Sequence, residues 1–180
     1  MRWISVLMLA LFVLTLQSSL VPRFSIVGAR PDLVLVVSVF FGMHAKWRDA
    51  LLAAWIMGAL GDLMTIERFG LLSVSYALGA AFVASVREYL FRYNAFSQFA
   101  LTAATSSLVG LGWLVYQRTM FAPSSSVVGD AMVLLLLTPL YTGILAPLAH
   151  AVLLPMSRLF GLTPPRYTFP GLHKQGGARV

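Results

Sequence analysis

The sequence predicts an all-α, polytopic membrane protein built as a bundle of about six transmembrane helices, and three observations lead to this prediction. Hydrophobic residues make up 59% of the chain and charged residues 11%, whereas soluble domains carry about 25% charged residues. The mean hydropathy is +0.84. The 180 residues accommodate roughly five to seven spans of about 20 residues with short connections. Since no room is left for a soluble domain, binding or chemistry is expected in the bilayer, in short loops or in the C-terminal tail.

Six apolar runs define the expected spans, at residues 3–21, 31–44, 50–64, 70–86, 96–116 and within 131–156. The first run resembles a signal peptide, but it continues to Val21 without a small-x-small cleavage site and is interpreted as an uncleaved span. The second is expected to start at Pro31 and Asp32, because Pro suits the first helical position and an acid in the first turn suits the helix dipole. Three prolines in the last run predict a kinked helix.

The second and third spans are short. About 15 residues form a helix of about 22 Å, which is less than the hydrocarbon core of about 30 Å. A re-entrant hairpin would place Lys46, Arg48 and Asp49 in the middle of the bilayer, where charges are costly. Two separate spans with interfacial ends, one anchored by Trp47, are therefore favoured.

Basic residues orient the predicted bundle. With six spans and the N-terminus inside, nine of the thirteen Lys and Arg residues fall on the inner side and four on the outer side, as the positive-inside rule requires. Both termini are therefore expected in the cytoplasm. Residues 1–158 would form a six-helix transmembrane domain, and residues 159–180 a basic cytoplasmic tail rich in Pro and Gly.

An acid, Asp62, lies in the third run on a stripe of small residues. Ala50, Ala54 and Gly58 precede it at intervals of four, so the four residues share one helix face. Small residues at this spacing let helices approach closely in lipid, and an ionisable residue within a span is a candidate functional site. Comparable stripes in the fourth and fifth spans predict that spans three, four and five pack against one another.

The predicted topology places Asp62 near the outer end of its span, on the same side as Asp32. Its carboxylate is expected to accept hydrogen bonds from Arg30, Arg68 or the backbone of residues 65–69, because an acid on a packing face needs donors. This would form a rigid turn suited to contact with a partner. Nothing in the sequence shows whether the two acids face each other.

Several chemistries lack the residues they need. Cys is absent, and the three His residues are scattered without metal-ligand spacing. No phosphate-binding loop or nucleophile elbow is present. The net charge of +7 is spread over loops and tail rather than collected in a patch, which argues against nucleic acid. No catalytic residue, metal or cofactor is therefore predicted.

Three short motifs, in order, resemble one protein family. They are RPDLVL at residues 30–35, GxxGDL at residues 58–63, and GL at residues 70–71 followed by Tyr76. Together they resemble the bacterial rod shape-determining protein MreD family. The residues that match, or that flank the match, are treated as structural or partner-contact positions: Pro31, Asp32, Gly58, Gly61, Asp62, Gly70 and Tyr76.

The resemblance implies a non-enzymatic scaffold of the cell-elongation machinery in the bacterial inner membrane. The implied partners are an MreC-like protein, a RodA-type transferase and a penicillin-binding transpeptidase, with MreB as an indirect partner. It also implies a fold similar to the S components of ECF transporters. Two alternatives stay open: a small-molecule-binding subunit of the S-component type, and an intramembrane enzyme, which would need a second polar group facing Asp62.

Overall fold

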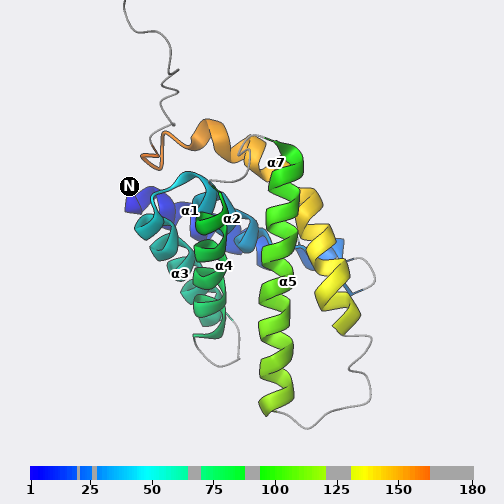
Figure 1. Ribbon diagram of the computed structural model, residues 1–180. Coiled ribbons are helices and arrows are strands. Elements are labelled where there is room, and N and C mark those ends of the chain that lie inside the picture. Colours follow the sequence, from blue (N-terminus) through cyan, green and yellow to red (C-terminus); the bar gives the residue numbers. More distant parts are fainter. Residues whose placement is uncertain (20, 26–27, 65–69, 88–93, 121–130, 163–180) are drawn as a thin grey trace, which may run out of the picture.

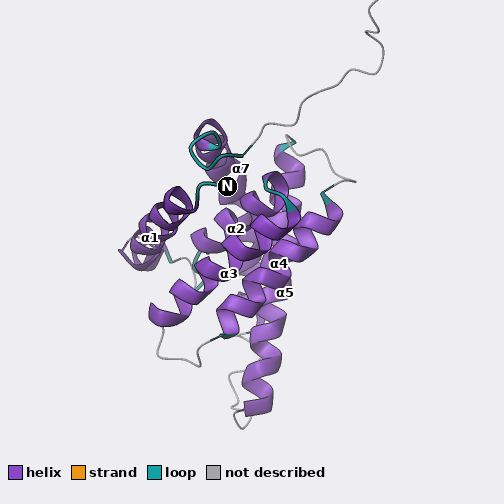
Figure 2. Ribbon diagram, turned by 90° about the vertical axis from the view of Figure 1, so that its left-hand side faces the viewer, coloured by secondary structure: helices purple, strands orange, loops and turns teal. Residues whose placement is uncertain are grey.

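The computed structural model describes residues 1–19, 21–25, 28–64, 70–87, 94–120 and 131–162, and nearly all of this part is helical (Figures 1 and 2). The elements are α1 (Trp3–Ser19), the 3-10 helix η1 (Val21–Phe24), α2 (Leu33–His44), α3 (Trp47–Met64), α4 (Leu71–Val86), α5 (Ala95–Met120), the π-helical segment η2 (Val133–Leu137) and α7 (Thr138–Met156). The all-α prediction is confirmed. The expected tail, residues 159–180, falls outside the described residues from 163 onward.

Two of the described helices are long and apolar enough to cross a membrane, Ala95–Thr119 and Val133–Met156. The apolar helices Trp3–Ser19, Leu33–His44 and Leu71–Val86 are shorter. With 12 residues, α2 is only about 18 Å long. The number of spans and the orientation of the termini remain predictions.

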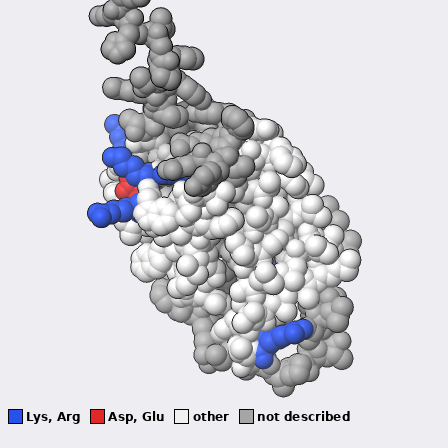
Figure 3. Space-filling view, viewed as in Figure 1, with Lys and Arg blue, Asp and Glu red and all other residues white. Residues whose placement is uncertain are grey.

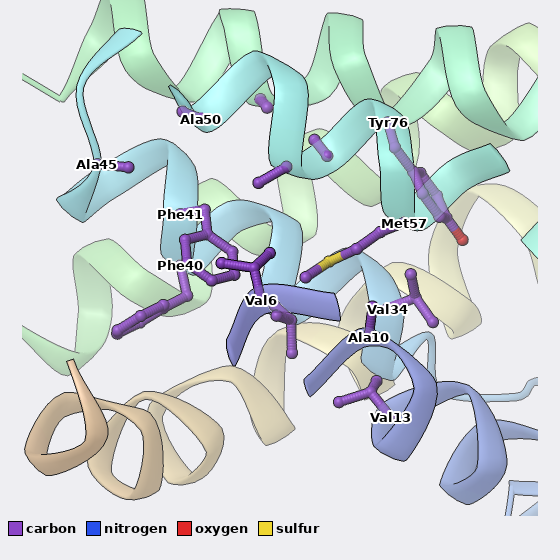
Figure 4. Close-up of a cluster of buried hydrophobic side chains, with 14 of the residues drawn as sticks. Val6, Ala10, Val13, Val34, Phe40, Phe41, Ala45, Ala50, Met57 and Tyr76 are labelled. Carbon is purple, nitrogen blue, oxygen red and sulfur yellow. The ribbon is translucent and has the colours of Figure 1, made fainter. Parts of the chain in front are cut away.

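Helix α2 forms the centre of the core. Ten of its 12 residues are buried, from Val34 to Met43. A helix that is apolar on all sides must be enclosed by other elements, and α2 packs against α1, α3, α4, α5 and α7. Figure 4 shows Val6 of α1, Met57 of α3 and Tyr76 of α4 reaching into the same cluster.

The outer faces of the helices are apolar. Helix α1 exposes Ile4, Met8 and Phe12, and α7 exposes Ile144 and Leu148. In Figure 3 most of the described surface is white, and the charged side chains gather near its two ends. Such contiguous apolar faces suit contact with lipid better than contact with water.

Two helices start two or three residues away from the predicted positions. Helix α2 begins at Leu33, so Pro31 lies outside it and Asp32 is its N-cap, with extended backbone angles. The reason is that the Asp32 carboxylate accepts a hydrogen bond from the Leu35 N–H, which is the N-cap arrangement rather than that of a first-turn residue. Helix α3 begins at Trp47, so the connection after α2 consists only of Ala45 and Lys46.

The last helical stretch is distorted where the sequence predicts a kink. Pro139 has no N–H, so the Leu135 carbonyl cannot be bonded within the α-helical ladder. The chain forms a π-helical turn just before it, in which the Thr138 N–H donates to the carbonyl of Val133. The Ser107 hydroxyl of α5 lies 3.5 Å from the Leu135 carbonyl and supplies it with a donor from outside the helix.

Candidate functional site

The carboxylate of Asp62, near the end of α3, caps the beginning of α4. It accepts hydrogen bonds from the N–H groups of Gly70, Leu72 and Ser73 at 3.0, 3.0 and 3.1 Å. The Ser73 hydroxyl donates to the same carboxylate at 2.6 Å. The first N–H groups of a helix have no partner within the helix, and here a side chain from the preceding helix supplies an acceptor. The side chain of Asp62 is 4% exposed, so the capping takes place inside the protein.

A close crossing of α3 and α4 brings Asp62 within reach. A Cβ atom at Gly58 would lie 2.5 Å from the Ser73 Cα and 2.7 Å from the Leu72 carbonyl oxygen. Both are backbone atoms, so only Gly fits at this crossing. Gly58 lies one turn before Asp62, and the stripe Ala50, Ala54, Gly58 and Asp62 is buried as predicted.

Gly70 provides the turn between Asp62 and α4. It is the N-cap of α4 and has a φ of 106°, which side chains with a Cβ rarely adopt. Apart from its chain neighbours, no atom of the described residues lies within 4 Å of the position its Cβ would take. The requirement for Gly is therefore conformational here, whereas at Gly58 it is steric.

The second acid, Asp32, links α2 to α4. One carboxylate oxygen accepts the N-cap hydrogen bond from Leu35 at 3.0 Å. The other accepts a hydrogen bond from the Tyr76 hydroxyl at 2.5 Å. Tyr76 is one turn beyond Ser73 on α4, so side chains on one face of α4 donate hydrogen bonds to both acids. Asp32, Asp62, Ser73 and Tyr76 are called the capping network below.

Two further polar side chains hold the chain segment before α2. The Gln17 side-chain oxygen accepts from the Leu33 N–H at 2.8 Å, and its amide nitrogen lies 3.4 Å from the Pro31 carbonyl. From α7, the Thr142 hydroxyl accepts from the Asp32 N–H at 3.1 Å. The start of α2 is thereby tied to α1, α4 and α7, which explains how residues far apart in sequence fix one corner of the bundle.

A recess of about 250 Å³ opens beside the capping network. Its lining comes from α2, α3, α4, α5 and the η2 region: Asp32, Leu35, Asp62, Leu71, Leu72, Ser75, Ser106, Val109, Gly110, Trp113, Leu134 and Thr138. On α5 the lining runs from Ser106 to Trp113, near the middle of the 26-residue helix. The short helices therefore end beside the middle of α5, which continues past the recess.

Most of the predicted site residues lie in one place. Asp32, Asp62 and Tyr76 belong to the capping network, while Gly58 and Gly70 shape it. The remaining two contribute less directly: a Cβ at Gly61 would meet only the Leu72 side chain, at 3.5 Å, and Pro31 contributes its carbonyl.

The described hydrogen bonds to Asp62 come from Gly70 and the first turn of α4, and the side chain of Arg30 is exposed. Residues 65–69 lie outside the described part, so Arg68 and the backbone of 65–69 stay predicted donors to Asp62. The expected packing of α5 against α4 is present, but α5 contacts the last helix more extensively. A Cβ at Gly110 would lie 2.9 Å from the Leu134 carbonyl oxygen, so Gly110 accommodates the bulged η2 segment.

Sequence reasoning missed Ser73, Gln17, Thr142 and Arg87. Ser73 belongs to the stripe of small residues in the fourth span, which indicated a close helix contact but not the hydrogen bond to Asp62. Arg87, at the end of α4, donates to the carbonyls of Gly42 and Ala45 and so satisfies the C-terminal end of α2. No local sequence pattern predicts this role of Arg87, because its acceptors are more than 40 residues away in the sequence.

The geometry does not favour catalysis. Asp62 and Ser73 are close, but the Ser73 side chain is 2% exposed and its hydroxyl donates into the carboxylate. A nucleophile needs a base and access to substrate; among the described residues no third group is seen to orient this pair, and Ser73 does not line the recess. His44 and His150 lie elsewhere, with ring centroids 6.1 Å apart. The described residues hold no group of three or more side chains suited to a metal ion.

The family model of the rod shape-determining protein MreD matches residues 1–160. The chain belongs to the MreD family. No curated protein and no solved structure matches it, so the likeness to ECF S components stays a prediction. In this MreD-family chain the three motifs that resemble the family lie together in space. The PDL run starts α2, and the GxxGDL run lies where α3 crosses α4. The segment from the GL run to Tyr76 donates hydrogen bonds to both acids, Asp62 and Asp32.

Proposed function

We propose that this MreD-family chain is a non-enzymatic, multi-pass scaffold of the bacterial inner membrane that helps maintain rod shape during lateral wall synthesis. Membership of the family supports the role in cell shape. The capping network supports a scaffold, because its acids are occupied in joining helices. A rigid corner with fixed geometry is what a docking partner needs, since ordering a flexible surface would reduce affinity.

In this proposal residues 1–158 form a six-helix transmembrane domain, and residues 159–180 a cytoplasmic tail. The apolar outer faces of α1, α4 and α7 support burial in lipid. The excess of Lys and Arg on one side supports two cytoplasmic termini. The short α2 would then end inside the membrane thickness, which local thinning or a neighbouring protein can accommodate.

The recess is the proposed docking site for a partner helix, and it is the observation that supports this function best. Beyond Gly110, α5 continues for ten residues, or about 15 Å. The start of α2, the end of α3 and the start of α4 lie beside the middle of α5, so α5 projects beyond them. The surface formed by these three helix ends is called the step. A transmembrane segment of an MreC-like protein could lie on the step beside Asp32 and Asp62, which line the recess, and near Pro31 and Gly61, which precede them in the sequence. The RodA-type transferase, the penicillin-binding transpeptidase and MreB would join through that partner.

Depletion in the source bacterium tests the role in cell shape. The proposal expects rods to round up during depletion and to recover when the full chain is supplied again. Affinity capture of the tagged full chain from native membranes is expected to recover the MreC-like protein. Cells that stay rod-shaped after complete depletion, or captures that contain no cell-wall partner, would overturn the proposal.

A small-molecule-binding subunit is the second candidate, favoured by the same recess. Two acids, Trp113 and the hydroxyls of Ser75 and Thr138 line it. Its volume of about 250 Å³ is below the ~300–1,000 Å³ of typical ligand pockets, so this candidate ranks second. A co-purifying metabolite, or a thermal shift produced by a panel of vitamins, would favour it over the scaffold.

A further inference from the structure

At the end of the bundle opposite the recess, three chain segments that are distant in sequence meet. The backbone N–H of Arg2 donates to the Phe160 carbonyl at 3.0 Å, and a Cβ at Gly161 would lie 3.5 Å from the Arg2 nitrogen. The Phe160 ring packs against Phe41 with centroids 5.7 Å apart. Figure 1 shows the orange end of the last helix crossing over to the start of α1.

The meeting of these segments gathers cations. Arg2 and Arg158 come from the first and last described segments, Lys46 comes from the α2–α3 connection, and Arg48 comes from the first turn of α3. All four side chains are exposed. These four residues are called the basic end surface. Figure 3 shows blue side chains collected at this end of the molecule, with one acidic side chain among them.

Among the described residues, the charge of the basic end surface is not neutralised by ion pairs. Within the described residues none of its four cations forms a salt bridge, and the nearby acid Asp49 lies in the first turn of α3, where the helix dipole stabilises it. The segments below are fixed, since Ala45, Phe160 and Leu162 are buried in the main core cluster. The side chains therefore project from a rigid base.

The neighbouring side chains indicate the depth of these cations relative to the membrane. Trp47, 43% exposed, and Leu159, 52% exposed, border them. Trp is typical of the membrane–water interface, and the apolar faces of the bundle begin just beyond. Arg binds phosphate through two parallel hydrogen bonds, and basic pockets between helices bind lipid headgroups.

We propose that the basic end surface, Arg2, Lys46, Arg48 and Arg158, binds the phosphate headgroup of an anionic phospholipid. This inference rests on the proposal that the chain lies in a membrane, but not on its role in cell shape. The fold supplies the site by joining the two ends of the described chain over α2. A headgroup held there would tie α1 and the last helix to the α2–α3 connection.

The test compares two full-length variants with equal loss of charge. One is Lys46→Gln/Arg48→Gln/Arg158→Gln, and the control is Arg23→Gln/Arg30→Gln/Arg118→Gln, which removes exposed cations elsewhere. Each protein is reconstituted in nanodiscs of phosphatidylcholine with a minority of phosphatidylglycerol. Native mass spectrometry then measures the enrichment of phosphatidylglycerol on the protein.

The wild type and the control are expected to be enriched in phosphatidylglycerol. In the first variant this enrichment should fall at least fivefold, because one cation near an anionic surface contributes about that factor. High salt should lower the enrichment of the wild type. Equal enrichment on the two variants would overturn the proposal. So would full displacement by inorganic phosphate at millimolar concentration, or by an acidic peptide at micromolar concentration, since these outcomes identify a free anion or an acidic protein as the ligand. Capture of the cell-wall partner is a separate measurement, so the scaffold role can fail independently.

Discussion

Replacing Asp62 by Asn removes the charge from the capping network while keeping the shape of the side chain. One oxygen of Asp62 accepts from Leu72, and the other accepts from Gly70 and from both donors of Ser73. Asn keeps one acceptor and places an NH₂ group at the other position. If the carbonyl takes the position with three donors, the Leu72 N–H faces another donor and is left without a partner.

The magnitude follows from these four bonds. A buried donor left unpaired costs about 1–3 kcal/mol, and hydrogen bonds to a charged group exceed neutral ones by about 1 kcal/mol each. Because the losses overlap, we expect the free energy of unfolding to fall by about 3 kcal/mol, a large part of the ~5–15 kcal/mol of a typical protein. For a chain of this length that corresponds to a midpoint lowered by about 6–12 °C.

Thermal unfolding of the purified full chain in detergent measures this effect. Asp49→Asn is the matched control, because it removes an acid from the first turn of the same helix and should cost only about 0.3–1 kcal/mol through the helix dipole. Hydrogen exchange should also rise at the first turn of α4 in Asp62→Asn and stay unchanged in the control. If both variants unfold within 1 °C of the wild type, Asp62 does not cap α4 and the reasoning fails.

Three further substitutions probe the same corner and the opposite end of α2. Gly58→Ala should lower stability by about 1–3 kcal/mol because its Cβ would meet backbone 2.5 Å away, whereas Gly61→Ala, which has room, should stay within about 1 kcal/mol; equal unfolding midpoints would contradict the close crossing. Tyr76→Phe should cost about 1.5–3 kcal/mol by removing the donor to the Asp32 carboxylate, and an unchanged chemical-denaturation midpoint would show that the bond contributes nothing. Arg87→Met should cost about 1–3 kcal/mol by leaving carbonyls at the end of α2 unpaired, with faster hydrogen exchange there; unchanged exchange would contradict this role.

The helical class and the positions of most helices could be predicted, because they depend on apolar runs and local signals. The stripe ending at Asp62 likewise predicted a close helix contact, and Gly58 provides it. Asp32 marked a helix start correctly, but sequence alone could not decide between a first-turn residue and an N-cap. That choice depends on which backbone N–H the carboxylate reaches, and the structure shows it to be that of Leu35.

The partners of the acids could not be predicted, because they are set by tertiary packing. Ser73 meets Asp62 only because α3 and α4 cross, and Tyr76 meets Asp32 across 44 residues of sequence. The approach of the η2 segment to α5 could not be predicted for a similar reason. Small residues indicate that a helix is approached closely, but they do not identify the approaching element; at Gly110 that element is the η2 segment before Pro139.

The most direct test of the scaffold account fills the recess without replacing any residue of the capping network. Val109→Trp places a large side chain into the recess from α5, and Thr138→Phe does so from the last helix, while Leu111→Trp introduces the same Trp side chain on an exposed part of α5. Each variant replaces the wild-type chain in the source bacterium, and cell shape is scored beside the amount of chain in the membrane and its capture of the MreC-like protein. The account predicts that both recess variants accumulate normally, lose the partner and give round cells, while Leu111→Trp keeps rods. Recess variants that accumulate, retain the partner and support rods would contradict it.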